Sequence, residues 1–175
     1  MGSQKKLYAV FLVVFLLIAG CGDSAEQRPQ TSAGVSVGQL APDFTLKSLT
    51  GEDVTLSSFR GKNPVFIIFW ATWCPYCIKD IPSLKEIYGT YSPKGLKILA
   101  IDIGLNDPVM RVQAFQKQFD IPYTILYDAT TSISRQYGVI GVPFNILIDR
   151  NGKVVYRSNS TPENLGKFVE KEKPV

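Results

Sequence analysis

The chain has 175 residues, a formal net charge of +4 and no histidine. This length accommodates one domain of roughly 100–200 residues together with a leader and a linker. With 45% hydrophobic and 19% charged residues, the composition is that of a globular protein and not of a disordered chain. Lysine and arginine are scattered along the sequence, so they are expected to form solvated surface, and nucleic-acid binding is not expected.

The first residues have the layout of an export signal. Two lysines precede an apolar run over residues 7–18, and small residues follow. As a helix this run would span about 18 Å, short of a hydrocarbon core of roughly 30 Å, which disfavours a permanent transmembrane helix. The stretch Ile18-Ala19-Gly20-Cys21 resembles a bacterial lipobox. The resemblance implies a lipoprotein signal peptide at residues 1–20 and a lipidated Cys21; a soluble secreted protein and an uncleaved short anchor are the alternatives.

Residues 21–37 are predicted to be the lipidated cysteine and a flexible tether, because Ser, Gln, Gly, Pro and Thr dominate there. One folded domain is predicted over residues 38–175. Lipidation would also explain the odd number of cysteines, three in all, since it leaves one pair for redox chemistry. One pair excludes a fold held together by several structural disulfides.

The folded part alternates short apolar segments with helical patterns, which predicts a mixed α/β sheet with helices on both faces. Strands at residues 44–46 and 54–56 flank a turn and predict a hairpin. The wholly apolar run at residues 65–70 indicates a central strand covered on both faces. Further strands are expected at residues 96–101, 124–127, 144–148 and 154–157, and helices at residues 74–91, 107–119, 131–137 and from Pro162 onward.

A Cys-x-x-Cys pair, Cys74 and Cys77, directly follows the central strand and begins the first long helix. Unpaired N–H groups and roughly half a positive charge at a helix N-terminus stabilise a thiolate. The first cysteine of such motifs has its pKa lowered from about 8.5 to between about 3.5 and 7.5. Cys74 is therefore predicted to be the nucleophile, and Cys77 the residue that resolves a mixed disulfide.

Other uses of a cysteine pair require further residues. A zinc site needs further ligands, but the chain has no histidine and its third cysteine lies in the leader. Haem attachment needs a histidine at position 78, which is Ile78. The sequence is also compatible with a structural disulfide and with a pair of unreactive core cysteines. The residues predict neither a metal nor a cofactor.

The stretch from Phe69 to Cys77 resembles the active-site region of thioredoxin-like proteins, and the similarity extends from about Gly38 to the C-terminus. Residues 38–44, 141–144 and 148–152 resemble the TlpA/ResA-like, membrane-anchored branch of the AhpC/TSA-redoxin type domains. The resemblance implies a thioredoxin-like fold, with a central mixed sheet flanked by helices, an N-terminal β-hairpin extension and an inserted helix.

The resemblance also implies a substrate-binding surface. Pro143, after Val142, matches a cis-proline that lies opposite the cysteines, in a loop that offers backbone groups to an extended substrate. Trp73, Pro75 and Tyr76 would complete this surface.

Asp80 is the remaining candidate catalytic residue. It lies on the same helix face as Cys77, and the TlpA/ResA-like branch often has a glutamate there. Asp80 would then exchange a proton with Cys77, although a solvated carboxylate near a helix N-terminus fits the sequence equally. Ile68 replaces the buried aspartate of thioredoxin, and the dipeptide Pro75-Tyr76 is that of glutaredoxins, so the direction of electron flow does not follow from the fold.

These features predict an extracytoplasmic thiol-disulfide oxidoreductase, a membrane-anchored lipoprotein and monomer on the periplasmic side or the outer face of the cytoplasmic membrane. It would take electrons from a membrane thiol donor and reduce disulfides in exported proteins, and the resemblance adds cytochrome c biogenesis with apocytochrome c as a substrate. A disulfide oxidase or isomerase would use the same site. A peroxiredoxin-like peroxidase needs Thr and Pro where Ala71 and Ile67 stand. The remaining alternative is a lipid-tethered binding module without catalytic activity.

Overall fold

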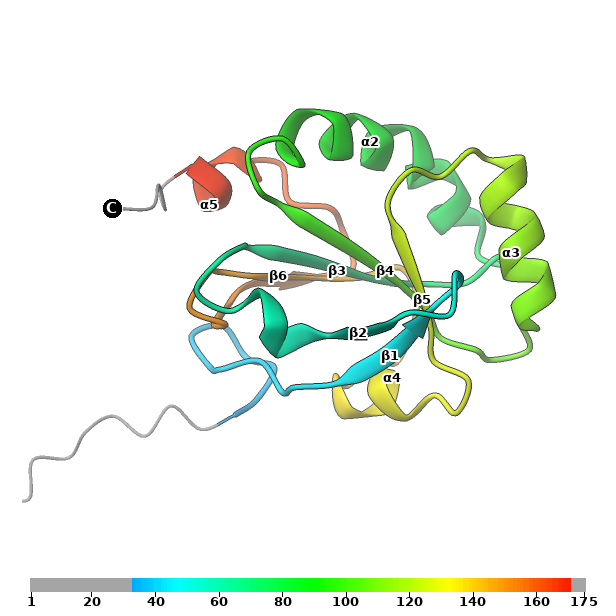
Figure 1. Cartoon of the computed structure of the whole chain (residues 1–175), viewed down its shortest axis with the longest axis horizontal. Coiled ribbons are helices and arrows are strands. Elements are labelled where there is room, and N and C mark those ends of the chain that lie inside the picture. Colours follow the sequence, from blue (N-terminus) through cyan, green and yellow to red (C-terminus); the bar gives the residue numbers. More distant parts are fainter. Residues whose placement is uncertain (1–32, 171–175) are drawn as a thin grey trace, which may run out of the picture. The chain divides into compact units, whose positions relative to one another are not determined.

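The computed structural model describes residues 33–170 (Figure 1). The predicted signal peptide and Cys21 lie outside the described residues. One sheet holds seven strands in the order β2-β1-β5-β4-β3-β6-β7. The strands are β1 (Thr45–Ser48), β2 (Asp53–Thr55), β3 (Val65–Trp70), β4 (Lys97–Asp102), β5 (Thr124–Tyr127), β6 (Phe144–Ile148) and β7 (Val154–Ser158). The helices are η1 (Leu56–Phe59), α2 (Pro75–Tyr91), α3 (Val109–Gln118), α4 (Ser132–Gln136) and α5 (Gly166–Glu170).

Strand β3 lies inside the sheet, parallel to β4 and antiparallel to β6, and β4 is parallel to β5. The remaining pairs are antiparallel, and they include the predicted β1–β2 hairpin. The mixed α/β sheet and its thioredoxin-like arrangement are therefore confirmed. Figure 1 shows α2, α3 and α5 over one face of the sheet and α4 over the other.

Every residue of β3 is buried, because the strand packs against both helical layers. Phe69 lies 5.5 Å from Tyr137, between ring centroids, on the α4 side. The next residue, Trp70, lies 5.3 Å from Phe115 of α3 on the opposite side. Alternate side chains of an extended strand point to opposite faces, which explains why the run is apolar throughout.

Several boundaries differ from the sequence prediction, by one to four residues. Leu56 begins the short helix η1 instead of ending β2. The predicted helix from Asp107 begins at Val109, because Pro108 is the N-cap with an extended backbone and the residue before a proline disfavours the helical conformation. The last helix begins at Gly166 and not at Pro162, because residues 163–165 form a turn.

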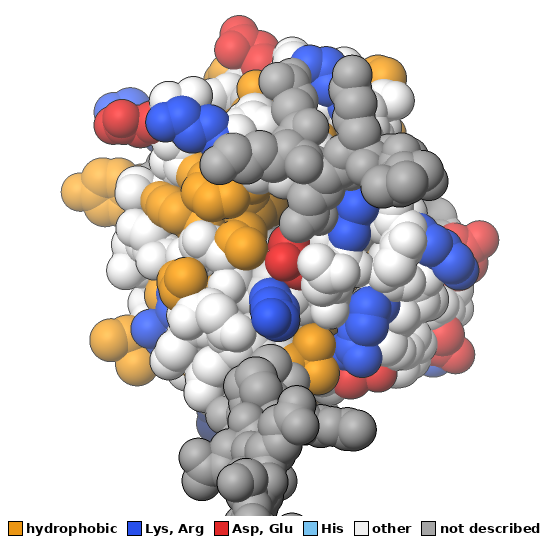
Figure 2. Space-filling model, turned by 90° about the vertical axis from the view of Figure 1, so that its left-hand side faces the viewer, with side chains coloured by type: hydrophobic (Ala, Val, Ile, Leu, Met, Phe, Trp, Pro, Cys, Tyr) orange, Lys and Arg blue, Asp and Glu red, His pale blue; other side chains and the backbone are white. Residues whose placement is uncertain are grey.

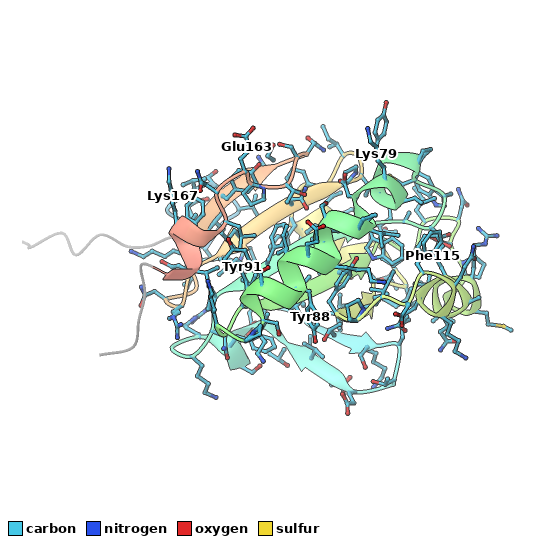
Figure 3. The ribbon with its side chains drawn as sticks, turned by 90° about the horizontal axis from the view of Figure 1, so that it is seen from above. Lys79, Tyr88, Tyr91, Phe115, Glu163 and Lys167 are labelled. Atoms are coloured by element: carbon cyan, nitrogen blue, oxygen red, sulfur yellow. A yellow bond between two sulfur atoms is a disulfide. The ribbon has the colours of Figure 1, made fainter. Side chains whose placement is uncertain are left out.

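The two ends of the sheet differ in which strand ends and helix ends they contain. The carboxyl ends of β3, β4 and β5 meet at one end, where α2 begins. Figure 3 shows Lys79, in the first turns of α2, at this end, while Tyr91 and Lys167 lie toward the other. In open sheets with parallel strands, functional sites form at the carboxyl ends of those strands.

Candidate active site

Cys74 and Cys77 form a disulfide at the N-terminus of α2. Cys74 is the N-cap, and the Cys77 backbone N–H donates to its Sγ at 3.2 Å. Pro75 occupies the first helical turn, where its missing N–H costs no helical hydrogen bond. Cys74 and Cys77 expose only 3% and 4% of their surface, respectively. The helix N-terminus therefore directs an amide and the positive end of its dipole at the predicted nucleophile.

The loop that leads into the motif is fixed by hydrogen bonds to the chain after β4. The Thr72 backbone N–H and hydroxyl donate to the two Asp107 carboxylate oxygens at 2.6 and 2.7 Å. The Trp73 indole N–H donates to the Leu105 carbonyl at 2.8 Å. Both Thr72 and Asp107 are buried, so these charge-assisted bonds hold the backbone before Cys74 in place.

The loop before β6 lies against the disulfide. The Val142–Pro143 peptide is cis, as the resemblance implied. The Val142 carbonyl oxygen lies 3.5 Å from Cys74 Sγ, within reach of a thiol hydrogen when the cysteine is reduced. Asn159 donates from its side-chain amide to the Pro143 carbonyl at 2.8 Å, which ties this loop to the end of β7. The structure therefore brings Val142 and Pro143 to the cysteines, as predicted.

A largely apolar groove of about 240 Å³ lies between Trp73, which precedes Cys74, and the Val142 loop. Trp73, with 46% of its surface exposed, and Leu105, with 51% exposed, form part of its lining together with Val142. Tyr76 exposes 72% of its surface on the first turn of α2. Exposed aromatic and aliphatic side chains beside a reactive centre provide contacts for a partner polypeptide.

A small cavity of about 20 Å³ lies behind Cys77, under α2. Asp80 lines it, and partial burial raises the pKa of Asp80 while the charge of Lys79 opposes the rise. Burial and the nearby Asp80 also raise the pKa of Tyr123, which keeps its phenol protonated. The other lining residues are Ile68, Trp70, Cys77, Ile81, Leu84, Ala100, Ile121, Pro143 and Asn145. Asp80 and Cys77 thus share one enclosed space, as their spacing on the helix predicted.

Several residues of this site were not found from the sequence. Asn145 is buried in β6, and neither atom of its side-chain amide has a hydrogen-bond partner among the described residues. The same holds for the Trp70 indole N–H. The sequence pattern predicts Asp107 at the start of a helix, although an acidic residue before Pro108 also fits a loop. No local pattern in the sequence shows that Asn145 or Tyr123 would face Cys77.

Within the part of the chain that the structure describes, no three His, Cys, Asp or Glu side chains are grouped to hold a metal ion. None of the helices described is long and apolar enough to span a bilayer.

The model of the AhpC/TSA family matches residues 37–157. The chain belongs to the AhpC/TSA family. It is 34% identical to the thiol-disulfide oxidoreductase ResA of Geobacillus thermodenitrificans, over 99% of this chain and 100% of that protein. It is 37% identical to the protein of the same name from Bacillus cereus, over 98% of this chain and 100% of that one.

Solved structures agree with these relatives. The thioredoxin domain of a thiol-disulfide oxidoreductase from Bacteroides vulgatus superposes with a TM-score of 0.68 at 26% identity, covering 79% of this chain and 98% of that one. This AhpC/TSA-family chain has the thioredoxin-like fold and is a thiol-disulfide oxidoreductase, which confirms the predicted fold and enzyme class.

Proposed function

We propose that this oxidoreductase works outside the cytoplasm, attached to the membrane, and reduces disulfides in exported proteins. The observation that carries the proposal is Cys74 at the N-cap of α2, where its Sγ accepts the Cys77 N–H at 3.2 Å. That amide and the helix dipole favour the thiolate form of Cys74, which is the form that attacks disulfides. Export and attachment are inferred from residues 1–20 and Cys21 of the sequence.

The reduced enzyme starts the reaction at Cys74. Its thiolate attacks one sulfur of a substrate disulfide, which forms a mixed disulfide and releases the other substrate sulfur as a thiolate. Deprotonated Cys77 then attacks Cys74 Sγ, and the substrate leaves with both sulfurs reduced. The product is the Cys74–Cys77 disulfide found in the structure. A membrane thiol donor would return two electrons and two protons to it.

Asp80 is proposed to take the proton from Cys77. The two residues line the same cavity, and partial burial raises the pKa of Asp80 toward that of a thiol. A base whose pKa lies nearer that of its proton donor transfers the proton more readily. Asp80→Asn should slow resolution of the mixed disulfide and remove one ionisation from its pH–rate profile, while Asp120→Asn, on an exposed side chain, should change neither. If Asp80→Asn left the pH–rate profile unchanged, Asp80 would be a solvated carboxylate that takes no part in proton transfer.

The substrate would lie as an extended segment along the Val142–Pro143 loop, with apolar side chains in the groove beside Trp73 and over Pro75 and Tyr76. The exposure of Trp73 and Tyr76 and the closeness of Val142 to Cys74 support this placement. Backbone pairing of this kind accepts many sequences, because the main-chain groups are common to all of them. Apocytochrome c, with its cysteine pair, is the substrate that the resemblance to the TlpA/ResA-like branch favours.

Trapping tests the roles of the two cysteines. Cys77→Ser should accumulate mixed disulfides with exported proteins through Cys74, because the resolving thiol is gone. Cys74→Ser is the matched control and should accumulate few. Mass spectrometry of the captured proteins would identify the substrates, apocytochrome c among them. Equal capture by both variants would contradict the assignment of Cys74 as attacker.

The direction of electron flow is tested by the reduction potential. Thioredoxin lies near −270 mV and the oxidant DsbA near −120 mV. A reductase is expected near the thioredoxin end of this range, as measured by equilibration with glutathione or dithiothreitol. A value near −120 mV would replace the reductase with a disulfide oxidase.

A further inference from the structure

The end of the domain opposite the disulfide is built by three loops that are far apart in the sequence. The Gly61 N–H donates to the Arg150 carbonyl at 2.7 Å, and the Arg150 guanidinium donates to the Lys62 carbonyl at 2.7 Å. The Asn63 side-chain amide donates to the Gly95 carbonyl, also at 2.7 Å. These bonds join the loop before β3, the β6–β7 turn and the loop after α2. Their side chains therefore share one surface.

Among the residues that the structure describes, cations outnumber carboxylates on this surface. Its cationic residues, called the basic pole below, are Arg60, Lys62, Lys94, Lys97, Arg150 and Lys153. Two described carboxylates lie near these cations: Asp149 accepts the Lys153 backbone N–H at 2.7 Å, and Asp43 accepts the Ser57 N–H at 2.8 Å. Figure 2 faces this end and shows several Lys and Arg side chains at its centre and to the right of it, beside one carboxylate, while the other carboxylates lie toward the edge. Scattered in the sequence, these charges form a patch in the fold.

The N-terminal part of the domain joins it at the same end. The Gly38 N–H donates to the Val154 carbonyl at 2.8 Å, and the Ala41 N–H donates to the Gly152 carbonyl at 2.9 Å. The backbone of Leu40 forms an isolated antiparallel β-bridge with that of Lys153, a residue of the basic pole. The chain therefore enters the domain beside the basic pole, at the end of the sheet away from the disulfide.

The length of chain before the domain limits how far this end can lie from a membrane. From Cys21 to Ala33 the chain can span at most about 40 Å. An anchor at Cys21 would thus keep the basic pole close to the lipid surface. Anionic lipids attract basic segments held near the membrane, and each added Lys or Arg strengthens binding about fivefold.

We propose that the basic pole binds anionic phospholipid headgroups and so orients the domain with its disulfide directed away from the membrane. The inference rests on the membrane attachment in the proposed function. Lys and Arg supply several donors to phosphate oxygens, and the attraction is reversible and weakened by salt. Exported substrates would then reach Cys74 from the aqueous side, and because the attraction is reversible, release of the lipids would let the domain turn toward a membrane donor.

Lysine labelling tests this orientation. The full-length protein is reconstituted in vesicles of phosphatidylcholine alone, or of phosphatidylcholine with phosphatidylglycerol, and treated with a membrane-impermeant amine reagent. Mass spectrometry should show Lys62, Lys97 and Lys153 labelled at least about fivefold more slowly on the anionic vesicles. Lys79 and Lys117, exposed elsewhere on the domain, serve as internal controls. Near 1 M salt, where the Debye length falls to about 3 Å, the protection should disappear.

A charge variant and a matched control complete the test. Arg60→Gln with Lys62→Gln should clearly weaken the protection of Lys153, whereas Arg111→Gln with Lys117→Gln should leave it unchanged. Equal labelling on both vesicle types would overturn the proposal. Protection in native membranes but not on protein-free anionic vesicles would overturn it too, because the partner would then be an acidic protein. Reduction of a soluble disulfide, measured on the same samples, reports the thiol chemistry separately.

Discussion

Replacing Asp102 by asparagine should remove a strong dependence of stability on pH. The side chain is fully buried at the end of β4, and one carboxylate oxygen accepts the Gly104 N–H at 2.9 Å. The other oxygen has no hydrogen-bond partner among the described residues. Burial, together with the nearby carboxylates of Asp107 and Asp128, raises the pKa of Asp102 from 3.8 to about 8. The folded protein therefore keeps a proton that the unfolded chain loses.

The sign follows from this difference in proton binding. Stability from the bound proton is fully present below pH 3.8 and is lost as the pH rises toward 8. One pKa unit corresponds to about 1.4 kcal/mol, so the Asp102 contribution should fall by roughly 2.7 kcal/mol between pH 5 and 7. Urea unfolding of the oxidised protein at pH 5 and pH 7 measures this change in the free energy of unfolding. Asp102→Asn should lose this slope and gain stability relative to wild type as the pH rises.

Asp120→Asn is the control for this experiment, because the Asp120 side chain is fully exposed. It should keep the wild-type slope. If Asp102→Asn kept that slope as well, Asp102 would not hold a proton in the folded state, and the account of its burial would be refuted.

Three further predictions concern stability around the site. Thr72→Val removes the hydroxyl that donates to buried Asp107, and should lower the free energy of unfolding by about 1–3 kcal/mol in urea titrations. Trp73→Phe removes the bond to the Leu105 carbonyl and should cost about 1 kcal/mol, with faster hydrogen exchange in residues 71–73; unchanged exchange would speak against a fixed loop. Asn145→Val replaces a buried amide without a described partner, so the melting temperature should rise, and a fall would mean that the amide is satisfied by solvent.

Local patterns predicted much of the fold and of the redox centre. The apolar run of β3, the cysteine spacing at the start of α2 and the position of Pro143 are each signals within a few residues of sequence. What the sequence could not show depends on contacts between distant residues. Asp107 holds Thr72 across 35 residues of chain, and the order of residues does not reveal that contact. The basic pole was missed for the same reason, since its lysines and arginines come from separate loops.

The positions of Trp70 and Trp73 have a practical consequence. They are the only two tryptophans of the chain. Trp73 directly precedes Cys74, and Trp70 lines the same cavity as Cys77. Disulfides quench excited indole rings over short distances by accepting an electron, whereas thiols do so less. The intrinsic fluorescence of the protein should therefore report the oxidation state of its cysteines directly, so that electron transfer can be followed in real time without a dye or an added label.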